Sequence, residues 1–178
     1  MSENDGKMKY LCCEAKNNRI MKKIKKPWID LTDKGYNCFA CAPSNPCGLK
    51  MEFYEDGDDI VSLWTPGDNY QGWLDTLHGG IQATLMDEIG GWIIARKFQT
   101  SGMTTNLNIK YKKPIPTGKD VRIEIRGRVK EVKRMFVFIE AEIIYDGEVR
   151  SMAEMTYYTF PKDVAAKDFM FTGCELEE

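Results

Sequence analysis

Hydrophobic and polar residues alternate with a period of two along six stretches of the chain, the pattern expected of strands with one buried face. These stretches are 49–54, 60–65, 104–113, 121–130, 137–145 and 149–160. The charged turn Glu55-Asp56-Gly57-Asp58 joins the first two, and Asp146-Gly147 gives a hairpin turn between the last two. The pattern therefore predicts about six antiparallel strands, with the last four arranged as a meander.

Between the second and third strands, apolar residues recur with the period of a helix. One stripe of this helix is large and apolar and comprises Ile81, Leu85, Ile89 and Trp92. The other stripe is small and comprises Gly80, Ala83, Thr84, Asp87 and Gly91. Solvated helix faces normally carry long polar side chains, so a carboxylate among small residues indicates that something packs close to it.

Two glycines inside the helix support the same interpretation. Gly90 and Gly91 each cost about 1 kcal/mol relative to alanine in a helix interior, and such glycines are tolerated where another group approaches closely. A helix that is apolar on nearly all sides needs burial on nearly all sides. A curved antiparallel sheet wrapped around one long central helix would supply that burial, which makes the fold class α+β.

Length and charge fit one domain with short additions. The chain has 178 residues and a net charge of -2, without the overall basicity of a nucleic-acid-binding protein. We divide it into a lysine-rich extension over 1–34, a domain over 35–161 and a loose tail over 162–178. No apolar run is long enough for a membrane span or a secretory signal, so we expect a cytoplasmic protein with no membrane partner.

The six cysteines are too few for a dense disulfide framework, so we expect reduced thiols. The Cys38/Cys41 spacing is compatible with zinc, but a structural zinc site needs four ligands. Cys47 could be a third, and Cys12 or Cys13 a fourth. Because the chain has no second motif of this spacing, a compact loop with packed thiols is the favoured interpretation, and we expect no metal or cofactor.

The stretch Leu77-His78-Gly79-Gly80 at the start of the helix, with Asp87 nine residues after the histidine, resembles the hotdog-fold acyl-CoA thioesterases, particularly the phenylacetyl-CoA thioesterase branch. The resemblance spans roughly 38–160. Gly102-Met103-Thr104, the turn Pro114 to Gly118 and the cysteine-containing loop 38–49 also resemble segments of that family. The resemblance implies a hotdog fold and hydrolysis of an acyl-CoA thioester.

In such enzymes the amide at the helix start polarises the thioester carbonyl, and an acid on the helix acts as general base or nucleophile. The resemblance assigns the first role to Gly79, supported by Gly80, and the second to Asp87. Helix-start N–H groups lack intrahelical partners and lie at the positive end of the helix dipole, which independently suits an oxyanion. Thr104 matches the position that orients the attacking water, with Thr105 as the fallback.

Other positions near the motif carry alternatives. Family members often have asparagine six residues before the histidine and glycine three before it, where this chain has Gly72 and Asp75; Gln71 is the candidate substitute for the asparagine. Glu88 is the competing acid. Either acid could instead pair with Arg96 or Lys97, and His78, the only histidine, is expected to have a structural or substrate-orienting role.

Gly80 and Asp87 share a helix face but lie seven residues apart, which is about 10 Å along the axis. One carbonyl cannot contact both within one subunit. We therefore expect a homodimer, or a dimer of dimers, in which Gly79 of one chain lies near Asp87 of the other.

The segment 110–134 holds ten basic residues against three acidic ones. Lys133 and Arg134, at a turn, are the best candidates for holding the phosphates of CoA. Trp73 and Trp92 could line an acyl pocket. We therefore expect an acyl-CoA thioesterase acting on a small, medium or aryl-acyl group, with a non-catalytic acyl-CoA-binding sensor on the same fold as the alternative; a dehydratase fits less well.

Overall fold

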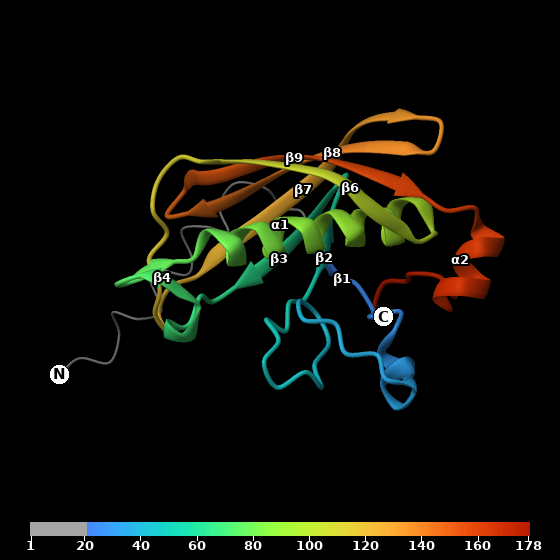
Figure 1. Cartoon of the computed structure of the whole chain (residues 1–178), viewed down its shortest axis with the longest axis horizontal. Helices are drawn as coiled ribbons and strands as arrows, with labels where there is room; N and C mark the ends of the chain where they lie inside the picture. The colour runs from blue at the N-terminus through green and yellow to red at the C-terminus, as the bar shows by residue number, and fades with distance from the viewer. Residues whose placement is uncertain (1–20) are drawn as a thin grey trace.

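The computed structural model describes residues 21–178, which form a long helix covered by a curved antiparallel sheet (Figure 1). The sheet has seven strands in the order β1-β2-β3-β7-β8-β9-β6. Their bounds are β1 Lys22–Lys23, β2 Tyr54–Asp56, β3 Asp59–Trp64, β6 Gly102–Tyr111, β7 Ile123–Lys133, β8 Phe136–Tyr145 and β9 Glu148–Thr159. A separate hairpin pairs β4 Gln71–Trp73 with β5 Thr76–Leu77. The α+β arrangement predicted from the periodicity is confirmed.

The central helix α1 covers Gly79–Ile93 and continues as a π-helical turn over Ile94–Phe98. Its large apolar stripe packs against the sheet, because Leu85, Ile89 and Trp92 are all at most 1% exposed. The small stripe is half-buried or exposed, and its Asp87 lies toward β6 and β9 at the edge of the sheet. Within residues 21–178 no helix is both long enough and apolar enough to cross a membrane.

The order of the strands differs from the predicted meander. β6 pairs with β9, at the sheet edge, and β7 pairs with β3 on one side and β8 on the other. The connection from β6 to β7 crosses the start of α1, where the Leu77 N–H donates to the carbonyl of Ile115 and the Ile115 side chain is fully buried. Period-two alternation identifies strands but not their partners, so this crossover could not be predicted from the pattern.

The first predicted strand is shorter than expected. Of the predicted stretch 49–54 only Tyr54 belongs to β2, which continues to Asp56 in the predicted turn, although Leu49, Met51 and Phe53 alternate into the core as predicted. The preceding residues hydrogen-bond to the cysteine-containing loop instead, with the N–H groups of Leu49 and Met51 donating to Phe39 and Ala40. The loop 37–49 is therefore fastened to the segment that leads into β2.

Both ends of the described chain meet beside the sheet. β1 pairs with β2, and Ile24 forms a bridge with Leu176, while the Glu177 N–H donates to the Lys23 carbonyl. The segment after Pro161, predicted to be loose, begins with helix α2 over Lys162–Phe169, whose Ala165 is fully buried. Short 3-10 helices occur over Ile29–Lys34 and Asp68–Tyr70. The division into extension, domain and tail stays a prediction.

Candidate functional site

His78 caps the N-terminus of α1. Its Nδ1 accepts a hydrogen bond from the Gly80 N–H at 2.8 Å, and its carbonyl accepts from the N–H groups of Ile81 and Gln82. The described residues provide no hydrogen-bond acceptor for the Gly79 N–H, whereas the Gly79 carbonyl accepts from the Tyr111 hydroxyl at 2.9 Å. Of the two helix-start glycines, only Gly79 therefore has an amide that is open to a ligand.

The hairpin β4–β5 leads directly into this cap. A Cβ atom at Gly72 would lie 2.8 Å from Cδ2 and 3.0 Å from Cα of His78, so a side chain has no room there. Asp75 has a φ of 52°, the left-handed region that favours glycine. Gln71 is half-buried and pairs with Leu77 of β5. Asparagine at the position of Gly72 would displace His78 in this chain.

Asp87 lies in the middle of the small stripe of α1 and is held from the sheet. The Thr104 hydroxyl donates to its Oδ1 at 2.6 Å, and the Tyr157 hydroxyl lies 3.2 Å from the same oxygen. The register of β6 shifts between Thr104 and Asn106, and the Thr105 hydroxyl donates to the Thr156 carbonyl instead. This bulge directs Thr104, and not Thr105, to the acid.

Contact with Tyr157 explains why residue 90, in the last turn of α1, is a glycine. Its hydroxyl also donates to the main-chain carbonyl of Asp87, and a Cβ atom at Gly90 would lie 2.6 Å from its ring. Burial, and then the charge of Asp87, raises the pKa of this phenol. The prediction that something packs close to Asp87 is confirmed at Gly90. Tyr157 itself was missed, because a tyrosine in an alternating strand is ordinary.

Glu88 faces a different neighbour. Its carboxylate accepts from the Trp92 indole N–H at 2.9 Å and lies 3.7 and 3.8 Å from the Cys38 sulfur. Burial, and then the charge of Cys38, raises the pKa of Glu88 to about 7. The alternative pairing of the helix acids with Arg96 or Lys97 does not occur, because both cations bind Glu55.

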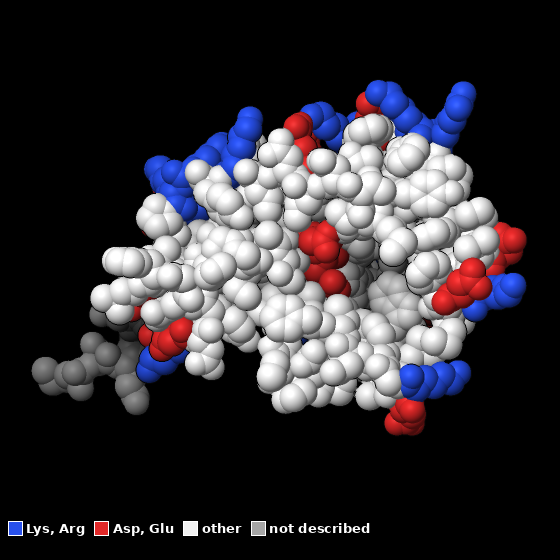
Figure 2. All heavy atoms as spheres, in the orientation of Figure 1, with Lys and Arg blue, Asp and Glu red and all other residues white. Residues whose placement is uncertain are grey.

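A cavity of about 560 Å³ opens beside both acids. Figure 2 shows a hollow on this face, with acidic side chains at its base and mostly uncharged residues around it. The cavity is lined by Trp28, Leu31, Lys34, Gly35, Tyr36, Cys38, Asp87, Glu88, Gly91, Trp92, Ala95, Thr100, Ser101, Gly102, Thr104, Tyr157, Phe169 and Met170. Of the two tryptophans predicted to line an acyl pocket, Trp92 lines this cavity, whereas Trp73 lies outside it with 80% of its surface exposed.

The basic segment 110–134 carries less free charge than its sequence indicates. Arg126 binds Asp56, Asp59 and Glu124, Arg128 binds Glu140, and Lys130 binds Glu154. Lys133 lies 2.9 Å from Glu131 on the same strand, and Arg134 forms the left-handed turn position between β7 and β8. Acids from neighbouring strands neutralise most of the excess positive charge of this segment. They could not be assigned to it from the sequence, because they are far from it along the chain.

The residues that could hold a metal in the described chain are Cys38, Cys41 and Glu88, whose ligand atoms lie within 4.8 Å of one another. Cys47, predicted as a possible third zinc ligand, is exposed and outside this group. Cys12 and Cys13 lie outside the described residues. Glu88 on α1, which is 50 residues from Cys38 in the sequence, therefore lies where Cys47 was predicted as a possible third ligand.

The part of the chain that contains this site is similar to known proteins. Residues 74–151 match the Thioesterase superfamily. Mouse acyl-coenzyme A thioesterase THEM4 is 34% identical over 99 residues, covering 56% of this chain and 39% of the relative. The chain spans less than half the length of the curated relatives it matches.

Solved structures show the same fold. A thioesterase superfamily protein from Shewanella loihica is 25% identical with a TM-score of 0.55, covering 62% of this chain and 91% of that one. The smu.793 protein of Streptococcus mutans, solved with acetyl CoA, is 18% identical with a TM-score of 0.57, covering 63% and 90%. The hotdog architecture expected from the helix-start motif is confirmed.

Proposed function

Because residues 74–151 match the Thioesterase superfamily, we propose that the chain hydrolyses an acyl-CoA thioester to a free acid and CoA. The observation that carries the proposal is the position of Asp87, a helix carboxylate held by Thr104 and Tyr157 beside a cavity. Two partners on the sheet fix this carboxylate in one place, which is the preorganisation that a base or nucleophile needs. The mouse relative is named an acyl-coenzyme A thioesterase, which agrees with this activity.

Each residue has a distinct part in the proposed reaction. The Gly79 N–H, at the positive end of α1, donates to the carbonyl oxygen and stabilises its charge as the carbon becomes tetrahedral. Asp87 takes the proton of the attacking water, or attacks the carbon itself, and the Thr104 hydroxyl orients the water. The Tyr157 hydroxyl holds Asp87 by its carboxylate and its main chain. Collapse of the tetrahedral centre expels the CoA thiolate, which takes up the proton; where Asp87 attacks the carbon itself, water then hydrolyses the acyl-aspartyl anhydride and releases the free acid.

The proposed site requires two chains. Gly79 and Asp87 are eight residues apart on one helix, which is about 12 Å along the axis and too far for one carbonyl. We propose a homodimer in which the half-buried small stripe of α1 faces its counterpart, so that each cavity receives Gly79 from the partner. The exposed edge strand β6 and the largely uncharged face in Figure 2 support this arrangement.

The size and lining of the cavity support an acyl-CoA substrate. A volume of about 560 Å³ lies within the usual range for small-molecule sites, and Trp92, Phe169 and Met170 offer apolar contact to an acyl or aryl-acyl chain. Arg134 and Lys133 stay our candidates for the CoA phosphates. The Streptococcus mutans neighbour was solved with acetyl CoA, which supports this ligand class.

Hydrolysis of a panel of acyl-CoA thioesters, followed with a thiol-detecting dye, tests the proposal. We expect turnover by the native protein and a loss of at least about 100-fold in kcat for Asp87→Asn, with KM nearly unchanged. Asp168→Asn, a change in α2, serves as the matched control and should keep full activity. Native turnover by Asp87→Asn would exclude this acid and direct attention to Glu88.

A second function is favoured by one observation. The chain has no room for a side chain at Gly72, where related enzymes often carry asparagine, so its oxyanion hole depends on main-chain N–H groups. A non-catalytic acyl-CoA sensor would bind the panel without cleaving it. Calorimetry beside the hydrolysis assay separates the two functions, because tight binding without thiol release identifies the sensor.

A further inference from the structure

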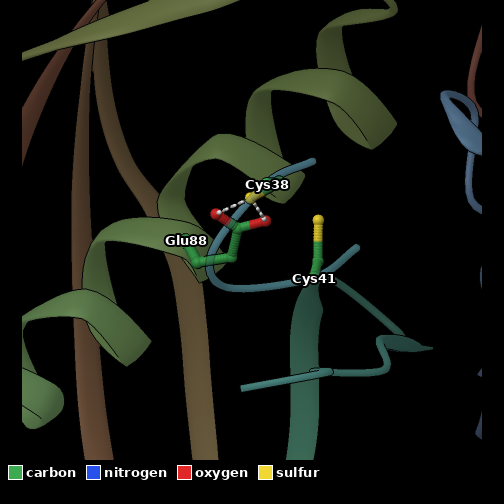
Figure 3. Close-up of side chains that lie close together, drawn as sticks. All are labelled: Cys38, Cys41 and Glu88. Carbon is green, nitrogen blue, oxygen red and sulfur yellow. Dashed lines mark hydrogen bonds between the residues drawn. The ribbon is translucent and has the colours of Figure 1, made fainter. Parts of the chain in front are cut away.

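We propose that Cys38, Cys41 and Glu88 form a binding site for a thiophilic divalent cation of the Zn²⁺ class. Figure 3 shows the three side chains converging from the loop 37–49 and from the middle of α1. Their ligand atoms all lie within 4.8 Å of one another. The proposed hydrolysis does not use either thiol, so this cluster needs an explanation of its own.

The spacing of the cluster is close to that of a metal site. Zinc binds thiolate sulfur at about 2.3 Å and carboxylate oxygen at about 2.0–2.2 Å, which in a tetrahedron separates two sulfurs by about 3.8 Å and a sulfur from an oxygen by about 3.5 Å. The Cys38 sulfur already lies 3.7 and 3.8 Å from the two oxygens of Glu88. Side-chain adjustments of no more than about 1 Å would complete the three-ligand set.

Each ligand is oriented by a neighbour that would act as an outer shell. The Tyr36 hydroxyl lies 3.0 Å from the Cys41 sulfur, and the Trp92 indole N–H donates to Glu88 at 2.9 Å. The main-chain N–H groups of Ala40 and Cys41 are directed at the Cys38 sulfur. Such contacts orient metal ligands and tune their affinity in known sites.

The charges around the cluster favour a cation. Two thiolates and one carboxylate would carry three negative charges, of which a divalent ion neutralises two. The Lys26 ammonium donates to the Cys41 carbonyl at 2.9 Å, which adds one positive charge beside the main chain of a proposed ligand.

Three protein ligands leave one tetrahedral position for a water molecule or another ligand. Cys38 and Glu88 both line the cavity that Asp87 and Thr104 share, so this fourth position belongs to the same cavity. A bound cation would also join the loop 37–49 to α1 beside Asp87. The loop 37–49 would then be held more firmly against one side of the cavity with the metal bound than without it.

Co²⁺ titration of the reduced, chelator-treated full chain tests the proposal. We expect one equivalent of Co²⁺ to produce thiolate charge-transfer absorption that one equivalent of Zn²⁺ removes. Cys38→Ser and Cys41→Ser should each weaken Zn²⁺ binding by at least about 100-fold, and Glu88→Gln by at least about 10-fold. Cys47→Ser, which removes an exposed thiol from the same loop, should change affinity by less than about twofold.

Because a substituted chain could fail to fold, circular dichroism of each variant accompanies the titration, and the spectrum of the native chain is itself decisive. Absence of charge-transfer absorption in the reduced native chain would overturn the proposal. Equal loss of binding in Cys47→Ser would overturn it too. A native chain that binds no Co²⁺ when reduced, and in which peptide mapping after treatment with a disulfide oxidant finds Cys38 joined to Cys41, would identify the two cysteines as a redox couple instead.

Discussion

Thr104 and Tyr157 lie directly opposite each other on β6 and β9, and both hydroxyls reach the same oxygen of Asp87. One pair of neighbouring strands thus holds a carboxylate that belongs to the helix beneath them. Because both hydroxyls come from the sheet, the position of the acid depends on how closely the helix and the sheet approach. Gly90, packed against the Tyr157 ring, sets that approach.

Thr104→Val should lower kcat by about 10-fold to 100-fold, because it removes the hydroxyl that contacts Asp87 while keeping the side-chain volume. Steady-state hydrolysis of the preferred thioester measures the effect. Thr105→Val is the matched control on the adjacent residue, whose hydroxyl donates to a main-chain carbonyl instead. Equal losses in both variants would remove the special role of Thr104.

Gly90→Ala should destabilise the protein by about 1–3 kcal/mol, because the new methyl group would lie 2.6 Å from the Tyr157 ring. Gly91→Ala meets only the Tyr157 hydroxyl, at 3.9 Å, and should stabilise by about 0.5–1 kcal/mol through helix propensity and a less flexible unfolded chain. Urea unfolding of the two variants measures both. Free energies of unfolding that change in the same direction would contradict this account of the two glycines.

His78→Ala should cost about 1 kcal/mol of stability, because it removes the side-chain acceptor for the Gly80 N–H. Asparagine is a good helix N-cap, so His78→Asn should restore most of that loss. If the imidazole serves only as a cap, His78→Asn will also keep its turnover. A folded His78→Asn variant without activity would instead show that the histidine contacts the substrate.

Ala83→Arg should convert the proposed dimer into a monomer and reduce kcat by at least about 100-fold, because the small stripe of α1 would have no space for an arginine against a second helix. Sedimentation equilibrium and hydrolysis assays on the same samples measure both effects. Met152→Arg, on β9 and lining a different hollow of the sheet, is the control and should remain an active dimer. A fully active Ala83→Arg monomer would rule out the composite site.

The sequence predicts the strands, the helix and the small stripe well, because each depends on a local period. Thr104 was placed near Asp87 only through the family resemblance, since the two are 17 residues apart. Tyr157 was not predicted, and Gly90 was the one signal that pointed to it. Sequence distance also hid the contact between Cys38 and Glu88, as well as the acids that neutralise the basic strands.

The described chain starts and finishes at one place, where the Glu177 N–H donates to the Lys23 carbonyl and Ile24 bridges to Leu176. In a chain cut down to residues 21–178, a short peptide joining the two ends would therefore close the backbone into a ring without moving a strand. New termini could then be opened at Gly147, in the β8–β9 turn, which has open space around it and lies away from the lining of the cavity. A chain with the same strands and helices connected in this new order should therefore adopt the same fold.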